Sequence, residues 1–443
     1  MALGKRTQDQ QELWVCTTEL ARAPGHPFYR KLNELLAEAK FDAWVEKRCA
    51  EYYAKDGRPS IPPGVYFRMI VAGYFEGISS QRGIAWRCSD SRSLAEFLGY
   101  GPTEATPDHS SLTRVHQRLP AAVHKEVFQF VLRIAVEKKL VDGKTVAVDS
   151  TTLEANAAMK SIERKDTKED WQTYLKRLAK EAGLENPTAE ELRRFDKNRP
   201  DKKVSNTEWE SRTDKDSRIT KMKDGTTHLA YKAEHVVDVK TDVVLAATVH
   251  PGTDPDPETL CDSVLEAQEN LQEAKSVVEI RDVVADKGYH AADTLEQAES
   301  LLLRTYIPER KQKGRRQWKG KPEGQQEAVY ANRRRMRGER GTRLQRKRSE
   351  LTERSFAHVC ETGGARRCWL IGLVKVTKRY LLQVAARNLG LILRKLFGIG
   401  TPRSLQGEGG LLVWVRFACY WLSAWCVERW QAGTRFATHP TAA

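Results

Sequence analysis

The chain has 443 residues, more than one ordinary hydrophobic core needs, so we expect two domains or one domain with large insertions. Its formal charge of +15 predicts attraction to a polyanion, either nucleic acid or an anionic membrane. The eight cysteines form no CxxC pair and have no His at zinc spacing, and no signal peptide begins the chain. These features exclude a disulfide-stapled secreted protein and predict a cytoplasmic one with reduced thiols.

The first 140 residues predict helices separated by turn signals. Segment 26–54 carries apolar residues at helical spacing and is followed by the breaker "GRPSIPP", and segment 63–77 predicts a buried helix. Segment 80–100, "SQRGIAWRCSDSRSLAEFLGY", has a helix-turn-helix layout compatible with DNA binding, and an ordinary helical bundle fits it equally well. We therefore expect an all-helical N-terminal domain over residues 1–140.

From Thr145 the periodicity changes to that of strands. The predicted order is strand, strand, strand, helix, strand, helix, strand, over "TVAVD", "HLAYKAEHVVDV", "DVVLAATVHPG", "PETLCDSVLEAQENLQEA", "VVEIRDVVADKGY", "AADTLEQAESLLL" and "RTYIPE". A further helix is expected near residues 340–358. This order predicts an α/β (α+β) domain over 141–400, a mixed five-stranded sheet flanked by helices. A charged insertion is expected at about 159–226.

Two other segments have unusual compositions. Residues 310–349 hold 16 Lys or Arg against three Glu, a net +13, with Trp318 and Tyr330 interleaved as possible base-stacking groups. A charge run is more often a solvated loop, but we expect this one to contact a polyanion, with Arg333, Arg334 and Arg335 as candidates. In the tail, 401–443, the apolar stretch 411–427 is shorter than the roughly 20 residues of a membrane span, so it predicts a packed helix.

Three carboxylates are candidates for one metal site. Asp149 and Asp286 each follow a short apolar run, "VAV" and "VVA", which predicts positions at the carboxyl ends of strands, where ligands gather in open sheets. Glu353 in "RSELTERSFAHV" is the preferred third acid, with Glu350 about one turn away in reserve. Carboxylates without His or Cys suit Mg²⁺, with Mn²⁺ as a substitute, and two such ions can promote displacement at a phosphodiester.

Other readings of these acids stay open. A single Asp is more often a turn former or a helix cap than a metal ligand. The rival acids lie in a hairpin, in a Pro-rich loop or early in a strand, and they are Asp238, Asp254, Asp256 and Asp282. His290 and His358 are possible bases, but metal-activated water removes the need for one.

Several segments resemble DDE transposases of bacterial insertion sequences. "VAVDSTTLEANAAMKS" resembles their first-Asp motif, "DVVADKGYHAADTL" the second-Asp motif and "TERSFAHVCETGGARR" the Glu motif. The block from "HPFYRKL" to "TPDHSSLTRVHQRL" resembles the helical domain before their catalytic core, and "VAARNLGLILRKLFGIGTPR" the C-terminal continuation. In those enzymes Tyr, Arg and Lys often flank the Glu, whereas this chain has Arg346, Ser349 and Cys360 there.

The resemblance implies an RNase H-like core with two Mg²⁺ ions bound by Asp149, Asp286 and Glu353. It implies a transposase that binds the terminal inverted repeats of its element, cuts the DNA there and joins 3′-hydroxyls to target DNA, as a homodimer on two ends. Lys287, Arg366 and Arg367 would contact DNA or are plain surface cations. We expect no membrane partner and a place in the bacterial cytoplasm beside the nucleoid.

Two alternatives share these residues. One is an RNase H-like nuclease or resolvase that hydrolyses DNA without strand transfer. The other is a non-catalytic DNA-binding derivative of a transposase.

Overall fold

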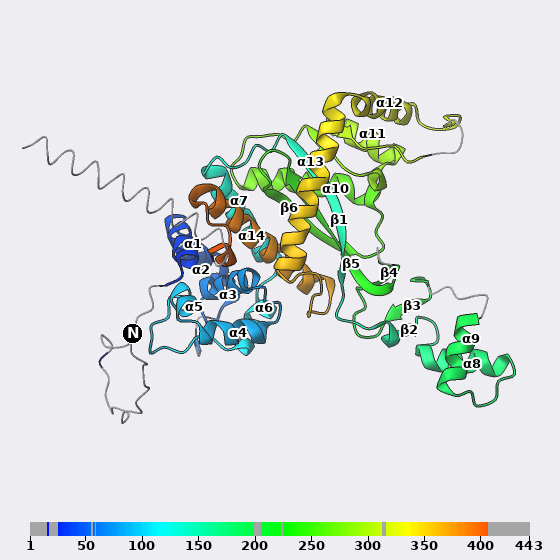
Figure 1. The fold of residues 1–443 in the computed structure, drawn as a ribbon, viewed down its shortest axis with the longest axis horizontal. Helices are drawn as coiled ribbons and strands as arrows, with labels where there is room; N and C mark the ends of the chain where they lie inside the picture. Colours follow the sequence, from blue (N-terminus) through cyan, green and yellow to red (C-terminus); the bar gives the residue numbers. More distant parts are fainter. Residues whose placement is uncertain are drawn as a thin grey trace, which may run out of the picture.

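The N-terminal part of the chain is helical (Figure 1). The computed structural model describes residues 16, 25–54, 56–57, 59–198, 205–222, 225–311 and 316–405. Up to residue 137 the helices are α1 (Pro27–Glu38), α2 (Phe41–Cys49), η1 (Ala50–Tyr52), α3 (Pro63–Glu76), α4 (Gln81–Asp90), α5 (Arg92–Phe97), α6 (His109–Arg118) and α7 (Ala121–Glu137). The predicted helical N-terminal region is confirmed.

Local chemistry fixes where these helices begin and end. Ser80 caps α4 by accepting a hydrogen bond from the Gly83 amide, and Asp108 caps α6 by accepting one from the Ser110 amide. α3 ends at Gly77, whose φ of 72° is unfavourable for other residues. α3 is buried along nearly its whole length, so it forms the centre of the helical part.

The sheet follows the predicted order of elements, with one strand more than expected. Its elements are β1 (Thr145–Glu154), β4 (Arg218–Lys221), β5 (Thr227–Asp238), β6 (Val244–Pro251), α10 (Asp256–Glu273), β7 (Asp282–Val284), η3 (Lys287–Tyr289), α11 (Ala292–Ser300) and β8 (Arg304–Tyr306). The order is β4-β5-β1-β7-β8, with β6 also paired to β5. β1, β7 and β8 are parallel and β5 is antiparallel to β1.

The expected count of five strands is wrong because β4 comes from within the predicted insertion and pairs with the start of β5. The rest of that insertion holds η2 (Met159–Ser161), β2 (Ile162–Arg164), α8 (Trp171–Glu181), α9 (Ala189–Asn198) and β3 (Trp209–Ser211). β2 and β3 pair with each other, and α8 and α9 project away from the sheet (Figure 1). Trp171 and Tyr174 of α8 pack on the buried ring of Trp209 and so anchor this projection.

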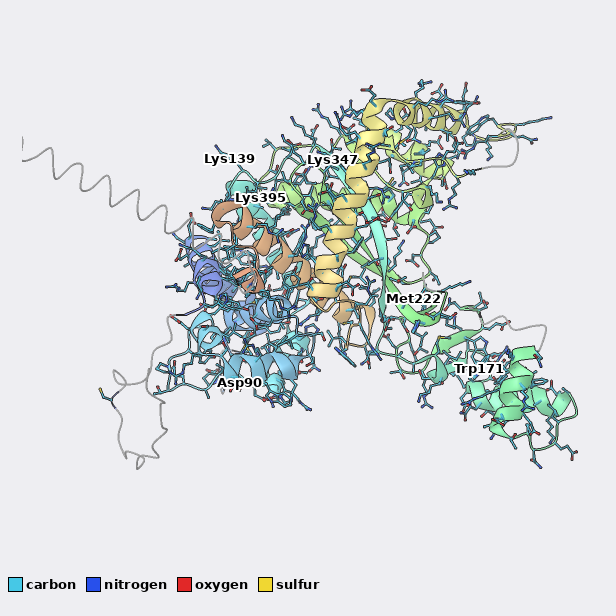
Figure 2. The ribbon with its side chains drawn as sticks, in the orientation of Figure 1. Asp90, Lys139, Trp171, Met222, Lys347 and Lys395 are labelled. Carbon is cyan, nitrogen blue, oxygen red and sulfur yellow. The ribbon has the colours of Figure 1, made fainter. Side chains whose placement is uncertain are left out.

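The C-terminal helices are α12 (Glu323–Arg337), α13 (Glu339–Phe356), the π-helical turn Ala357–Thr362, α14 (Leu373–Phe397) and η5 (Pro402–Leu405). α13 and α14 cover one face of the sheet, whereas α12 packs on α11 and β8 through the apolar cluster of the other face. α13 crosses the strands, and Lys347, labelled in Figure 2, is exposed on it. α14 packs against α3, α7 and β6, so one buried apolar cluster runs from the N-terminal helices to this face of the sheet.

The opposite face of the sheet packs on α10 and α11 through a second apolar cluster that includes Val146, Val148 and Val283. Within the described residues, no helix is both long enough and apolar enough to cross a membrane. The apolar stretch 411–427 lies outside the described residues.

Candidate active site

Asp149 lies in the middle of β1, not at its end as predicted, because the strand continues through "STTLE" to Glu154. Side chains alternate along a strand, so Asp149 shares the α13 face with Ala147 while Val146 and Val148 face α10. Asp149 Oδ2 accepts hydrogen bonds from Arg348 Nη1 at 2.7 Å and Thr352 Oγ1 at 3.0 Å, one turn apart on α13. Its Oδ1 accepts one from the Ser150 amide at 2.9 Å.

Asp286 follows the end of β7, as predicted. β1 and β7 are parallel with Ala147 opposite Val284, and each acid comes two residues later in its segment, so Asp286 lies just beyond β7 while Asp149 is still within β1. Burial raises the pKa of Asp149, and the charge of Asp286 acts in the same direction against Arg348, Ser150 and Thr352. Two of the three predicted acids are therefore close enough to interact.

Glu353 is exposed on α13, and no hydrogen bond or ion pair joins its carboxylate to another described residue. Gln345 of the same helix donates to the carbonyls of Ala285 and Tyr306, which fixes the flank of α13 that faces the carboxyl ends of β7 and β8. Glu353 lies eight residues further along, which places it about 80° around the helix axis from Gln345. Its side chain is more exposed than that of Gln345 and makes no described contact with Asp149 or Asp286.

The opposite flank of α13 faces the other edge. Arg340 pairs there with Asp282 at the start of β7, and Arg354 with Asp242 before β6. The reserve acid Glu350 is exposed and held by Arg354. Among the described residues, no three His, Cys, Asp or Glu side chains are arranged to hold a metal ion, so the third acid is not gathered in with the other two.

Asp256 is a fourth acid at this edge that the sequence analysis set aside. It begins α10 and accepts a hydrogen bond from Ser150 Oγ at 3.0 Å. A Cβ on Gly288 would lie 2.7 Å from Asp286 Oδ1 and 3.0 Å from Asp256 Oδ2, so both carboxylates border this glycine. The overlooked signal was Pro257, because proline early in the first turn is typical of a helix start and places the preceding acid at its N-terminus.

A buried network of hydrogen bonds surrounds the start of α10, where Asp256 lies. Lys232 Nζ on β5 donates to the Asp254 carbonyl at 2.8 Å and to Thr259 Oγ1 at 3.0 Å, and lies 3.4 Å from Asp256 Oδ1. Glu234, on the same face of β5, accepts from Tyr289 Oη at 2.7 Å and Thr259 Oγ1 at 3.0 Å. Burial raises the pKa of Glu234. The network ties β5, α10 and the turn after Asp286 together.

A hollow of about 390 Å³ opens beside the acids. Ser150, Asp256 and Gly288 line it together with three cations, Lys221, Lys232 and Arg310. Arg310 Nε donates to the Lys287 carbonyl at 3.0 Å, which holds its guanidinium beside the turn after Asp286. The hollow thus combines carboxylates with cations that can pair with phosphate.

His235 fixes α13 over β1. It lies opposite Asp149 in the β1–β5 pairing and is completely buried. Its Nδ1 bonds with Ser355 Oγ at 2.9 Å and its Nε2 with Tyr380 Oη at 2.8 Å, while its ring stacks on Phe356 with centroids 4.2 Å apart. Both ring nitrogens are therefore used in holding α13 and α14 to the sheet.

The arginines predicted to bind DNA on α12 differ in their surroundings. Arg334 is exposed. Arg333 pairs with Glu309 at 2.8 Å, and Arg335 Nε donates to the Thr305 carbonyl at 2.9 Å. Burial lowers the pKa of Arg335. Of the three, Arg334 is the one whose side chain is most open to a partner.

The predicted cations nearer the acids also divide into two groups. Lys287 is exposed directly after Asp286, and Arg367 is exposed with its guanidinium 5.0 Å from the Trp369 ring centroid. Arg366 instead pairs with Glu361 at 2.6 Å and donates to the Thr152 carbonyl at 2.9 Å. Arg366 thereby attaches the loop after the π-helical turn to β1.

Two family models match the chain, a transposase domain (DUF772) over residues 17–118 and a transposase DDE domain over residues 309–393. The first match spans α1 to α6. The second spans α12, α13 and most of α14, so it includes Glu353, Arg366 and Arg367, and the segment that carries Asp149 and Asp286 lies between the two matches. Neither the curated proteins nor the solved structures gave a match.

Proposed function

Because the chain belongs to the DDE transposases of insertion sequences, we propose that it cuts DNA at the terminal inverted repeats of its element and joins the freed 3′-hydroxyls to target DNA. The observation that carries this proposal is the placement of Asp149 on β1 and of Asp286 just after the adjacent parallel strand β7, close enough for their charges to interact. Two neighbouring carboxylates at the centre of a sheet of this order can share divalent cations at a phosphodiester.

Asp149, Asp286 and Glu353 would hold the cations, two Mg²⁺ ions or Mn²⁺ in their place. The donor set fits because it consists of oxygen atoms, which these ions prefer. It also fits electrostatically, since burial raises the pKa of Asp149 and the Asp286 charge adds to that effect, so a cation would stabilise the pair. When bound, the ions supply activation of the attacking oxygen and neutralisation of the leaving oxygen.

Arg348 has a place in this proposal. Its guanidinium donates to Oδ2 of Asp149 at 2.7 Å, so it would compete with a cation held by this carboxylate. It is then placed to pair with a DNA phosphate at the same edge. Glu353 is exposed on the same helix, so it would have to move toward Asp149 and Asp286 to join them as a ligand.

The remaining parts of the proposal concern DNA and assembly. Residues 1–140 would supply recognition of the terminal repeats, and the exposed cations of segment 310–349 would contact phosphates and fix register. Lys287 and Arg310, beside Asp286, would contact the phosphates nearest the cut. Two copies of the chain would bring two DNA ends together.

A cleavage and strand-transfer assay with Mg²⁺ tests this function. Duplex DNA that carries the element ends should be cut and joined by the parent protein, and Asp149→Asn and Asp286→Asn should each reduce the rate at least about a hundredfold. Asp262→Asn, an exposed site on α10, is the matched control and should react like the parent.

Three results would contradict the proposal. Cleavage by Asp149→Asn at the rate of the parent would show that Asp149 is not a catalytic residue. Hydrolysis of pre-cut ends without joining would identify a nuclease or resolvase, and binding of the ends without any reaction would identify a non-catalytic derivative.

A further inference from the structure

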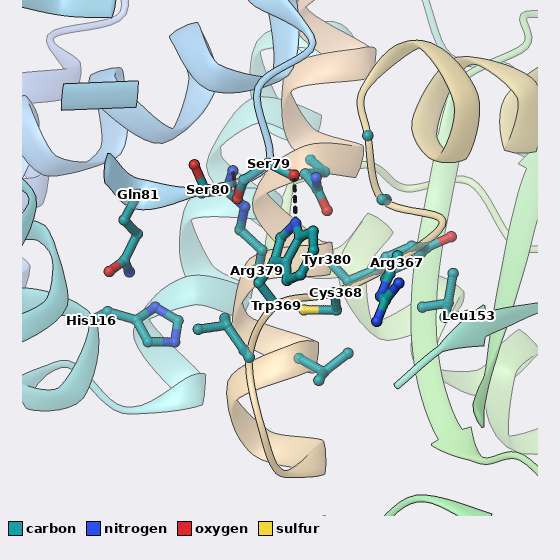
Figure 3. A pocket seen from close by; sticks show the side chains of 15 residues that line it. Ser79, Ser80, Gln81, His116, Leu153, Arg367, Cys368, Trp369, Arg379 and Tyr380 are labelled. Carbon is teal, nitrogen blue, oxygen red and sulfur yellow. Dashed lines mark hydrogen bonds between the residues drawn. The ribbon is translucent and has the colours of Figure 1, made fainter. Parts of the chain in front are cut away.

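A second hollow, of about 150 Å³, lies where the N-terminal helices meet residues 364–370 and the start of α14 (Figure 3). Ser79, Ser80 and Gln81 line it at the start of α4, His116 on α6, and Arg367 and Arg379 on the C-terminal side. None of the described residues that line it is Asp or Glu. We call it the junction pocket.

Arg379 is buried in the junction pocket, and no carboxylate of the described residues pairs with it. Its side chain is 6% exposed, and its Nη2 donates long hydrogen bonds to the carbonyls of Ile78 at 3.4 Å and Ser79 at 3.3 Å. Its Nε has no hydrogen-bond partner among the described residues. Burying a cation without a counter-ion is unfavourable, so this guanidinium has unused capacity for an anion.

Lys378 and the start of α4 add positive potential, whereas His116 is neutral because burial lowers its pKa to about 3. Lys378 is 6% exposed and donates to the His116 carbonyl at 3.2 Å. His116 is 4% exposed, its Nδ1 bonds with Tyr66 Oη at 3.0 Å, and its Nε2 has no partner among the described residues. α4 begins at this pocket, and the partial positive charge of a helix N-terminus favours anions.

The rim of the pocket carries an aromatic ring. Trp369 is 51% exposed, its Nε1 donates to Ser79 Oγ at 2.9 Å, and Arg367 lies over its face at 5.0 Å (Figure 3). An exposed indole beside an arginine can stack on a nucleobase, which adds a nucleic-acid feature to the cationic interior. The pocket has room for an oxyanion of phosphate size.

We propose that the junction pocket is a phosphate site, in which Arg379, Arg367 and the N-terminus of α4 hold a phosphodiester of bound DNA while Trp369 stacks on an adjacent base. The anion site stands on its own geometry, and only the source of the phosphate rests on the proposed transposase function. The pocket joins α4 and α6 to the loop that pairs with the end of β1 through Glu154, whose amide donates to the Arg366 carbonyl at 2.9 Å. DNA held here would therefore link the N-terminal helices to the strand that carries Asp149.

The first test measures anion binding by thermal unfolding, without divalent metal. Sodium phosphate should raise the Tm of the full chain above its value in sodium chloride of equal ionic strength, and Arg379→Met should abolish that rise. Without phosphate, Arg379→Met should melt at or above the parent, because a desolvated cation has been removed. A rise that persists in Arg379→Met, or no rise in the parent, overturns the proposal.

The second test measures DNA affinity, again without divalent metal. A labelled duplex with an element end should bind Arg379→Met and Arg367→Gln about tenfold more weakly than the parent. Arg193→Gln on α9 removes the same charge at an exposed position outside the pocket and should bind like the parent. If Arg379→Met loses the phosphate-induced rise in Tm but binds the duplex as tightly as the parent, DNA is not the ligand of the pocket. The pocket would then bind free phosphate.

Two features keep these tests decisive. If Arg379→Met does not fold, Arg367→Gln and Trp369→Ala change exposed side chains and give the same readouts. The measurements are also made on Asp149→Asn, so a failure of DNA cleavage leaves their outcome unaffected, and a failure of the phosphate site leaves the cleavage assay unaffected.

Discussion

The candidate active site and the junction pocket bury charge of opposite sign, and they differ in how that charge is compensated. The acids at the sheet edge have internal counter-ions, since Arg348 pairs with Asp149 at 2.7 Å and Lys232 approaches Asp256 at 3.4 Å. Within the part of the chain that the structure describes, Arg379 in the junction pocket donates to carbonyls alone, and its Nε has no partner. A cation at the first site would therefore compete with groups of the protein, whereas an anion at the second would meet an N–H donor that is not yet used.

The largest expected effect concerns Glu353, the proposed third metal ligand of the candidate active site. Glu353→Gln should lower the DNA cleavage rate about a hundredfold, because the proposed third metal ligand is lost. Glu350→Gln, whose carboxylate pairs with Arg354, should stay within about twofold of the parent on the same measurement, as surface changes usually do. A larger loss in Glu350→Gln than in Glu353→Gln would reverse the assignment.

The next effect concerns the space between the acids. Gly288→Ala would place a Cβ 2.7 Å from Asp286 Oδ1 and 3.0 Å from Asp256 Oδ2, so at least one carboxylate must move. We expect the cleavage rate to fall about tenfold or more while the Tm changes little, because sub-ångström misplacement of catalytic groups is costly. Gly338→Ala has its nearest neighbour at 3.7 Å and serves as the control. Full activity in Gly288→Ala would show that these carboxylates need not be fixed.

A smaller effect is expected on DNA binding, where the exposed Arg334 should contribute more than Arg333, which already pairs with a carboxylate of the protein. Arg334→Ala should weaken DNA binding about threefold and lower the slope of log affinity against log salt by about one, since one phosphate contact is lost. Arg333→Ala should change that slope less, because its guanidinium pairs with Glu309. Salt titrations of DNA affinity give both slopes, and equal slopes for the two variants would contradict the distinction.

The smallest effect is on stability and depends on pH. Burial raises the pKa of Asp149 in the folded chain, so the ionised carboxylate opposes folding above that pKa, and protonation relieves this as the pH falls through it. Asp149→Asn should thus melt at or above the parent near neutral pH, and the difference should shrink in acid. Melting curves across pH test this, and a lower Tm for Asp149→Asn at neutral pH would mean that the Arg348 pair outweighs burial.

The sequence was sufficient where a local pattern determines structure. The helical N-terminal part, the order of strands and helices, and the position of Asp286 after β7 all follow from periodicity and turn signals. The end of β1 was misplaced because a carboxylate looked out of place in a strand. Thr151 and Thr152 continue the strand, and Asp149 is accommodated there by Arg348 and Thr352 from nearly two hundred residues away.

Two features of the sites could not be predicted from the sequence, the pairing of Arg348 and the burial of Arg379, because both depend on contacts between distant segments. Arg348 lies in a charge run, which normally indicates a solvated surface, and its pairing with Asp149 becomes visible only when α13 is placed on the sheet. Arg379 lies in a mostly apolar helix, and its burial against Ile78 and Ser79 joins segments three hundred residues apart. No local pattern encodes such pairings.

Anomalous diffraction from Mn²⁺-soaked crystals tests most directly whether Asp149 and Asp286 share a divalent cation. We expect a manganese peak in contact with both carboxylates in the parent protein, and no such peak in Asp149→Asn. Manganese bound elsewhere on the chain, with no peak between Asp149 and Asp286 at saturating Mn²⁺, would contradict it.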